Sequence, residues 1–208
     1  MKRYLHNTQG IALVTSLMMT LISMAIIMAL MYVITASTQR SGANKRYKSA
    51  VEAAGDGSRF VAKDVMPYLM NQFQNFTSSQ VINNAAADFA AVNLVTTSAD
   101  CLKTKINKNT ASWPASCSAA FNPKSQPDMT LTLQGTSNMP FTVYAKIVDT
   151  VAGNSDTSGS RLEESSGVAY LANTTTPMPF PYMYRLEVQG ERQSSSIEKS
   201  NISILYAY

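Results

Sequence analysis

The hydrophobic positions of the chain gather in one uninterrupted run near the N-terminus. Residues 11–34 read IALVTSLMMTLISMAIIMALMYVI, without a charge, a proline or a glycine. A helix rises about 1.5 Å per residue and a bilayer core is about 30 Å thick, so this run is long enough to cross a membrane. Its hydroxyl side chains can bond to the carbonyls of the preceding turn, which makes them tolerable in lipid. We therefore predict a transmembrane helix over residues 11–38.

Beyond this run, apolar residues recur at spacings of three, four and seven, which is typical of an amphipathic helix. These positions are Tyr47, Val51, Ala54, Val61, Val65, Tyr68 or Leu69, Phe73 and Phe76. The simplest interpretation is one long helix over residues 11–76, whose second half, residues 39–76, lies under a globular head. Two helices broken near Gly42 are the alternative, and Pro67 is a position where the helix can kink.

Four later segments alternate apolar and polar residues with period two, which indicates β-strands. They are residues 129–134, 141–150, 182–190 and 197–207, with turn-rich connectors at 135–140 and 190–196. We predict an α+β fold in which about four antiparallel strands pack on the second half of the helix, with the head at residues 77–208. Residues 152–181 are rich in Gly, Ser, Thr and Pro and indicate a long surface loop that can carry recognition residues.

The residues before the apolar run form a short polar segment. Residues 1–10 read MKRYLHNTQG, with Lys2 and Arg3 as the only formal charges, and the apolar run begins at once with Ile11. Three interpretations compete: a cleavable secretory signal, a plain single-pass anchor, and a leader that is cut after Gly10. A secretory signal has an apolar region of about 7–15 residues followed by a small-residue cleavage site. The run here is longer, and no such site follows it.

Three pieces of the first 60 residues carry a resemblance to a known family. They are Gly10-Ile11-Ala12-Leu13 at the junction, Asn44-Lys45-Arg46 after the stem, and Ala50-Val51-Glu52-Ala53-Ala54. This N-terminal region resembles that of PilX-type minor pilins in the type IV pilin family. The resemblance implies a prepilin that a membrane peptidase cuts after Gly10 on the cytoplasmic side. It also implies methylation of the new Ile11 amine and a pilin-like head.

Two positions depart from the family pattern. Most major pilins have Glu at the fifth mature position, which is Thr15 here, and Gly55 stands where the family run usually continues with Glu. In the family, that first carboxylate is thought to pair with the amine of a neighbouring subunit, because a charge in an apolar core is costly unless paired. Thr15 cannot supply this charge. The resemblance therefore implies a minor pilin-like subunit that primes or caps pilus assembly.

The resemblance also implies a location and partners. The chain would span the inner membrane once, with its head in the periplasm, and later reach the pilus at the cell surface. Its partners would be other pilins and minor pilins, bound through the N-terminal helix, together with the prepilin peptidase and the inner membrane. A minor pseudopilin of a type II secretion system is the first alternative. A plain single-pass periplasmic binding or adhesion protein is the second.

The charges that flank the apolar run bear on its orientation. Arg40, Lys45, Arg46 and Lys48 follow the run, and the positive-inside rule alone would place that side in the cytoplasm. Long domains translocate largely regardless of charge, however, and the hydroxyl-rich composition after the run favours export. We expect the N-terminus inside and the head outside.

Cys101 and Cys117 are the only cysteines and enclose a short polar segment. In an exported chain such a pair predicts a disulfide; free buried thiols are the alternative. His6, in the leader, is the only histidine, so a Ser-His-Asp or Cys-His device and a zinc site are not expected.

We predict no enzyme, no cofactor and no metal site. The acidic residues Asp149, Asp156, Glu163 and Glu164 could offer oxygen ligands to Ca²⁺, but their spacing matches no EF-hand, and we interpret them as a solvated loop. The net charge of +4 is mild and its basic residues are scattered, so no nucleic-acid partner is expected.

Overall fold

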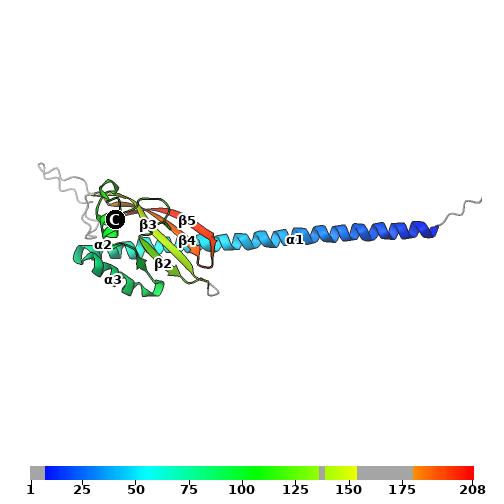
Figure 1. The fold of residues 1–208 in the computed structure, drawn as a ribbon, viewed down its shortest axis with the longest axis horizontal. Helices are drawn as coiled ribbons and strands as arrows, with labels where there is room; N and C mark the ends of the chain where they lie inside the picture. The colour runs from blue at the N-terminus through cyan, green and yellow to red at the C-terminus, as the bar shows by residue number, and fades with distance from the viewer. Residues whose placement is uncertain (1–7, 136–138, 154–179) are drawn as a thin grey trace, which may run out of the picture. The chain divides into compact units, whose positions relative to one another are not determined.

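The computed structural model describes residues 8–135, 139–153 and 180–208. The chain divides into two compact units, Met1–Arg46 and Tyr47–Tyr208. The first contains the apolar part of a long N-terminal helix, and the second contains an antiparallel sheet with the helices that pack on it (Figure 1). The predicted α+β class, with a long apolar N-terminal helix and an antiparallel sheet, is confirmed.

Helix α1 spans Thr8–Phe60, 53 residues in all. It continues through Gly42, so the alternative of two helices broken at that point is wrong. A Cβ at Gly42 would meet no atom within 4 Å, which shows that no packing within the described chain requires a glycine there. Glycine lowers helix stability by about 1 kcal/mol relative to alanine, and in a helix of this length that local loss does not interrupt the backbone bonding.

Helical structure continues beyond α1 in a different form. A π-helical segment, Val61–Val65, leads into helix α2, Met66–Asn75, and the Met66 amide donates to the Val61 carbonyl five residues back. Pro67 follows immediately. In a regular α-helix a proline ring clashes with the carbonyl four residues earlier and leaves that carbonyl without a donor. The irregularity expected at Pro67 is therefore a wide π-helical turn directly before it.

The sheet contains five antiparallel strands in the order β1-β2-β3-β4-β5, so every strand pairs with its neighbour in the chain. The strands are β1 (Val95–Thr96), β2 (Met129–Leu133), β3 (Phe141–Val151), β4 (Met183–Arg192) and β5 (Ser195–Ala207). The four predicted strands are confirmed, and the two-residue β1 is additional. The predicted connector at residues 190–196 is wrong in extent, since only residues 193–194 separate β4 from β5. An irregularity in register between Ile147 and Asp149 interrupts the pairing of β3 with β4.

Small residues of α1 face the sheet. The buried positions of this part of the helix are Ala50, Ala53, Ala54, Gly57 and Ser58. A Cβ on Gly57 would lie 2.7 Å from Val143 Cγ1 of β3, and a Cβ on Gly190 of β4 would lie 2.7 Å from the Ala54 backbone nitrogen. Real Cβ atoms do not approach other atoms so closely. Helix and sheet therefore touch at a distance that only glycine permits at these two points.

The buried stripe of the helix differs from the predicted one at its ends. Tyr47 and Phe76 are exposed and Val51 is half-buried, whereas Val61, Val65, Leu69 and Phe73 are buried as predicted. Phe76 lies one residue beyond the end of α2, in extended backbone, so the helical spacing no longer directs its side chain to the core.

Residues 77–128, where no element was predicted, contain two further helices. They are α3 (Ser78–Asp88) and α4 (Ala99–Asn107), with 3-10 turns at Ala90–Val92 and Thr110–Ser112. Helix α3 begins with a capping box, in which Thr77 and Gln80 satisfy each other's backbone amides. Ser98 caps α4 by accepting a hydrogen bond from the Cys101 amide. Both helices contribute to the main core, α3 through Val81 and Ala85 and α4 through Leu102 and Ile106.

Candidate functional site

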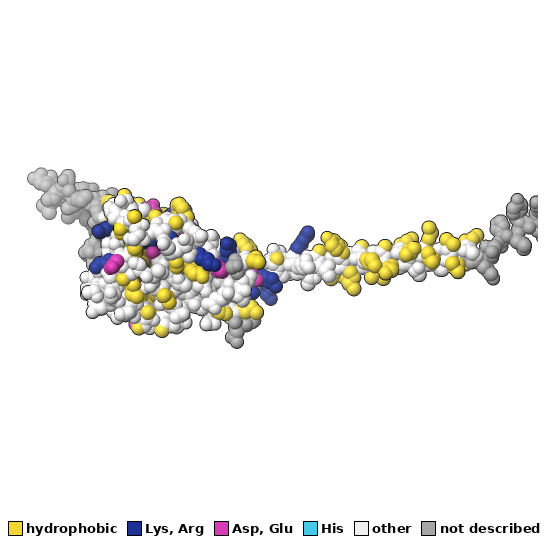
Figure 2. Space-filling view, viewed as in Figure 1, with side chains coloured by type: hydrophobic (Ala, Val, Ile, Leu, Met, Phe, Trp, Pro, Cys, Tyr) yellow, Lys and Arg dark blue, Asp and Glu magenta, His cyan; other side chains and the backbone are white. Residues whose placement is uncertain are grey.

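The apolar part of α1 is exposed along its whole length. Every large hydrophobic residue between positions 11 and 34 exposes 54–75% of its surface, and Figure 2 shows hydrophobic side chains on this part of the helix. Soluble proteins rarely expose contiguous apolar patches larger than a few hundred Å². Within the described part of the chain, this is the one helix long and apolar enough to cross a membrane. An apolar surface of this kind is stable in contact with lipid or with other apolar helices.

Hydroxyl side chains in this helix are satisfied locally. Thr15 Oγ1 donates to the Ala12 carbonyl at 3.0 Å, and Thr20 Oγ1 donates to the Leu17 carbonyl at 2.9 Å. Ser16 and Ser23 make the same kind of bond to the preceding turn. The predicted back-bonding is confirmed, and it removes the cost of placing these hydroxyls in lipid. Thr15 thus stands at the fifth position after the junction as a neutral group whose proton already has an acceptor.

The Gly10–Ile11 junction lies inside the first turns of α1, which begins at Thr8. A Cβ at Gly10 would meet no atom within 4 Å, so packing within the described chain does not require a glycine at this position. Glycine also weakens a helix relative to alanine. The presence of Gly10 therefore has no cause in the fold itself. The leader residues 1–7, with Lys2, Arg3 and His6, lie outside the described residues.

The two cysteines form a disulfide, as predicted. Cys101 on α4 and Cys117 are joined with their Cα atoms 5.3 Å apart, and the described residues contain no free cysteine. The bridge fixes the segment that follows the Thr110–Ser112 turn to helix α4. Trp113, inside the closed segment, donates from Nε1 to the Lys108 carbonyl at 2.9 Å. The loop is therefore tied to α4 by covalent and polar contacts together.

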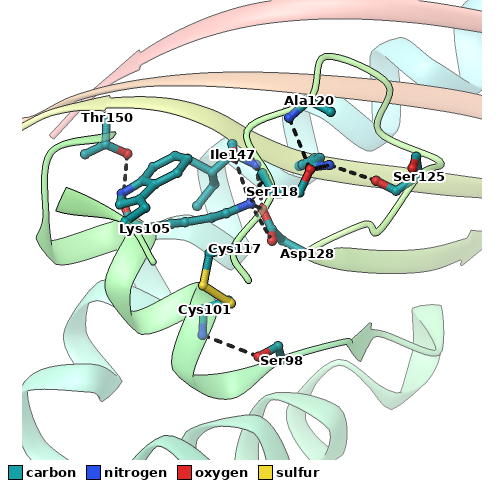
Figure 3. A network of polar contacts seen from close by, with 12 residues as sticks. Ser98, Cys101, Lys105, Cys117, Ser118, Ala120, Ser125, Asp128, Ile147 and Thr150 are labelled. Atoms are coloured by element: carbon teal, nitrogen blue, oxygen red, sulfur yellow. Dashed lines mark hydrogen bonds and ion pairs between the residues drawn. A yellow bond between two sulfur atoms is a disulfide. The ribbon is translucent and has the colours of Figure 1, made fainter. Parts of the chain in front are cut away.

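A buried ion pair lies beside this disulfide, between α4 and β3 (Figure 3). The Lys105 ammonium donates to both Asp128 oxygens at 2.9 and 2.8 Å, and to the carbonyls of Ser118 and Ile147 at 2.8 and 3.0 Å. Asp128 Oδ2 also accepts from the Ile147 amide at 2.8 Å. The exposed fraction of Lys105 is 1%. Four oxygen acceptors around one ammonium leave it well compensated, which a buried charge requires.

Burial and charge act on the pKa values of this cluster in opposite directions. Burial raises the pKa of the Asp128 carboxyl, and the Lys105 ammonium and the Ile147 amide counteract that rise. Burial, followed by the nearby Lys105 charge, lowers the pKa of Lys146, which Asp128 partly offsets. Lys146 donates to Ser118 Oγ at 3.0 Å and to the Ser125 carbonyl at 2.7 Å. Two lysines thus hold the segment that carries Ser118 and Ser125 against the sheet.

This polar cluster escaped the sequence-based prediction, although one signal was present. Lys105 stands three residues after Leu102 and one before Ile106, and both of these are buried core residues of α4. A lysine on the apolar stripe of a helix indicates a buried partner. The sequence does not identify that partner, because Asp128 lies 23 residues further along the chain, directly before β2. The cluster joins α4, β3 and the segment that carries Ser118 and Ser125, so it serves to anchor this loop.

Candidate metal ligands do not gather in the parts that the structure describes. No group of three or more His, Cys, Asp or Glu side chains lies close enough to hold a metal ion there. Of the four acidic residues considered for Ca²⁺, Asp149 accepts a hydrogen bond from Thr110. The other three, Asp156, Glu163 and Glu164, lie outside the described residues, as does most of the 152–181 loop.

The chain matches no protein-family model, no curated protein and no solved structure. The candidate functional site therefore stands on the residues themselves, and it consists of the Gly10–Ile11 junction and the exposed apolar helix that follows it.

Proposed function

We propose that the chain is a minor subunit of the type IV pilin kind that primes or caps pilus assembly. In this proposal a prepilin peptidase removes residues 1–10, and the Ile11 amine becomes the methylated N-terminus. The apolar helix first holds the chain in the inner membrane, with the head in the periplasm, and later joins the helical core of the filament. Other pilins are the partners, and the chain acts as a structural subunit, not as an enzyme.

The junction carries this proposal. Gly10 has no packing role within the described chain, and it is followed at once by an uncharged helix whose apolar surface is uncovered. A peptidase that recognises glycine as the residue before the cleaved bond would account for Gly10. Transfer of the helix from lipid into a bundle of similar helices exchanges one apolar surrounding for another, so little hydrophobic cost opposes assembly. A plain single-pass anchor explains the helix but not the glycine.

Processing at this junction gives the first test. With a co-expressed prepilin peptidase, the intact mass and N-terminal sequence of the membrane-extracted protein are expected to show a start at Ile11, and without it a start at Met1. Gly10→Val is expected to retain residues 1–10, because the peptidase no longer meets glycine. Gly42→Val is the matched control, since Gly42 is equally without neighbours within 4 Å, and it is expected to be cut normally.

Each other outcome of this test favours a different class. A Met1 start in the presence of the peptidase would indicate a plain membrane anchor and would overturn the pilin proposal. A start beyond the apolar run, in both samples, would indicate a secretory signal.

The place in the filament depends on Thr15. Because its hydroxyl is neutral and bonded to Ala12, it cannot neutralise the amine of a neighbouring subunit in an apolar core. Quantitative mass spectrometry of sheared fibres is expected to find the chain far below the main subunit in amount. Thr15→Glu supplies a carboxylate and is expected to increase that share, while Thr15→Gln, of similar size without the charge, is not. Abundant incorporation of the unaltered chain would contradict a priming or capping role.

A further inference from the structure

The two edges of the sheet differ in length. The strand order places β1 at one edge and β5 at the other (Figure 1). β1 contains two residues, whereas β5, Ser195–Ala207, contains 13. Native proteins commonly keep edge strands very short, or interrupt them with proline, bulges or charges, because the unpaired backbone groups of an edge bind other strands. β1 follows this rule by its length, and β5 does not.

The hydrogen bonds at the end of β5 show which of its backbone groups point away from β4. The Tyr182 amide donates to the Tyr208 carbonyl and the Tyr208 amide donates to the Tyr182 carbonyl, both at 2.9 Å. From there the register of β4 and β5 continues without a shift as far as the pair Glu191 and Lys199. In an antiparallel ladder, pairs that exchange both bonds alternate with pairs that exchange none. Even-numbered residues of β5 therefore bond to β4. The amides and carbonyls that point outward belong to the odd-numbered residues, which include Lys199, Asn201, Ser203 and Leu205.

The usual protections of an edge are missing from this part of β5. Residues 199–207 read KSNISILYA, with no proline and with Lys199 as their only charge. Their pairing with β4 contains no bulge. In the part of the chain that the structure describes, no strand pairs with the outer side of β5. Residues 199–205, called the open edge below, thus present a regular row of backbone donors and acceptors. An extended backbone has the same spacing and is the partner that satisfies such a row.

Side chains on the two faces of the open edge specify what kind of strand fits. On the face toward the core, Ile202 and Ile204 are half-buried, and Ile204 packs against the main core. On the opposite face, Leu205 exposes 70% of its surface and Lys199 is exposed. Side chains directly opposite each other on neighbouring strands are in contact. A fitting strand therefore has apolar residues beside Ile202 and Ile204, another beside Leu205, and an acidic residue opposite Lys199.

We propose that the open edge of β5 binds an extended segment of a partner protein, which adds to the sheet as a sixth, antiparallel strand. The ligand class is a peptide segment whose side chains alternate, with apolar residues toward the core and an acidic residue at the Lys199 end. Backbone hydrogen bonds supply the affinity of such a contact, and the alternating side chains supply its specificity. The inference uses the head alone, so it does not depend on whether the chain is a pilin.

Amide exchange of the free protein tests the open edge first. The full-length, isotope-labelled chain in detergent is expected to show slow exchange at the amides of Ile202 and Ile204, which bond to β4. Fast exchange is expected at the amides of Asn201, Ser203 and Leu205. Slow exchange at both sets would show that the edge is already covered and would overturn the proposal. If that protection disappeared on dilution, a second copy of the chain would be the occupant instead.

A synthetic peptide then serves as the probe. Acetyl-Val-Val-Thr-Ile-Thr-Thr-Glu-amide, running antiparallel to β5, places its first valine opposite Leu205 and its glutamate opposite Lys199. Its addition is expected to slow exchange at the amides of Asn201, Ser203 and Leu205. Unchanged exchange at saturating peptide would overturn the proposal.

Two variants at one position separate the backbone from the side chain. Asn201→Pro is expected to weaken peptide binding by at least about tenfold, because it removes an outward amide from the middle of the open edge. The β4–β5 ladder does not use that amide, and proline is tolerated where the amide of an edge strand faces solvent. Asn201→Ala, the matched control, keeps the amide and is expected to bind as the unaltered chain does. Equal affinity of the proline variant would place the peptide elsewhere and overturn the proposal.

A charge exchange tests the register without altering the backbone of β5. Lys199→Glu is expected to weaken binding of the peptide by at least about threefold, because two like charges then lie opposite each other. A second peptide, with lysine in place of its glutamate, is expected to show the reverse preference. If neither peptide distinguished the variant from the unaltered chain, the proposed register would be wrong. Retention of residues 1–10 in the presence of the peptidase would overturn the pilin proposal and leave these measurements unaffected.

Discussion

Asp128→Ala is expected to destabilise the head by about 3–5 kcal/mol, the range typical of a buried charge left without its partner. In that variant the Lys105 ammonium, which exposes 1% of its surface, keeps only the neutral carbonyls of Ser118 and Ile147 as acceptors. The Ile147 amide loses its acceptor as well. Urea unfolding of the full-length chain in detergent, followed by the fluorescence of Trp113, measures the effect. Trp113 is the only tryptophan, and its ring centroid lies 5.2 Å from Lys105 Nζ.

Two further variants separate charge from packing. Removing both charges with Lys105→Met and Asp128→Leu is expected to be less harmful than Asp128→Ala alone, because neither member of the pair is left as a buried charge without its partner. Arg59→Gln breaks the ion pair of Arg59 with Asp56, in which both side chains are exposed. Its effect is expected to be much smaller, since water already screens that pair. If Asp128→Ala unfolded at the same urea concentration as the unaltered protein, the ion pair would not be the anchor of this loop.

Removal of the disulfide by Cys101→Ala and Cys117→Ala is expected to lower the free energy of unfolding by about 3 kcal/mol. The bridge joins residues 16 apart, and in the chain-entropy model a closed loop of that size restricts the unfolded chain by about this amount. Urea unfolding followed by Trp113 fluorescence and by circular dichroism measures it. Because Trp113 lies inside the closed loop, its transition is expected to precede that of the helices if the loop detaches first.

Reduction of the unaltered chain provides the comparison for this pair of substitutions. A phosphine reductant is expected to reproduce the loss of stability in the unaltered protein and to leave the cysteine-free variant unchanged. Equal unfolding midpoints for the oxidised and reduced protein would show that the ion pair and the Trp113 contacts hold the loop without the bridge.

The parts of the fold that a linear pattern encodes were predictable. Alternation of period two located β2, β3, β4 and β5, because each of these strands is long enough to show it. The two-residue β1 is too short to show any alternation. Helix α3 carries only two buried residues, so its stripe is weak, although the Thr77–Gln80 capping box was readable as a start signal.

The candidate junction can also be read along the chain, and its processing stays a prediction. Gly10, Ile11 and Thr15 are consecutive features of one segment, and the two cysteines form a pair because there are no others. The Lys105–Asp128 pair is non-local, so no spacing rule identifies it. The need for a glycine at position 57 comes from the approach of Val143 of β3, which lies far along the chain. Such contacts follow only from the three-dimensional arrangement.

The wide turn at Val61–Val65 determines the direction around the helix axis in which the side chains of α2 point. One extra residue in a turn rotates the subsequent helix by about 100° relative to a continuous α-helix. Gly57 precedes this turn, Val61 is its first residue, and both are buried. Leu69 and Phe73, which follow the turn, are buried too. In an uninterrupted α-helix the slow drift of residues spaced four apart would carry the later pair round toward solvent. The π-turn therefore corrects the helical phase, so that Val61 before it and Leu69 and Phe73 after it all belong to one core.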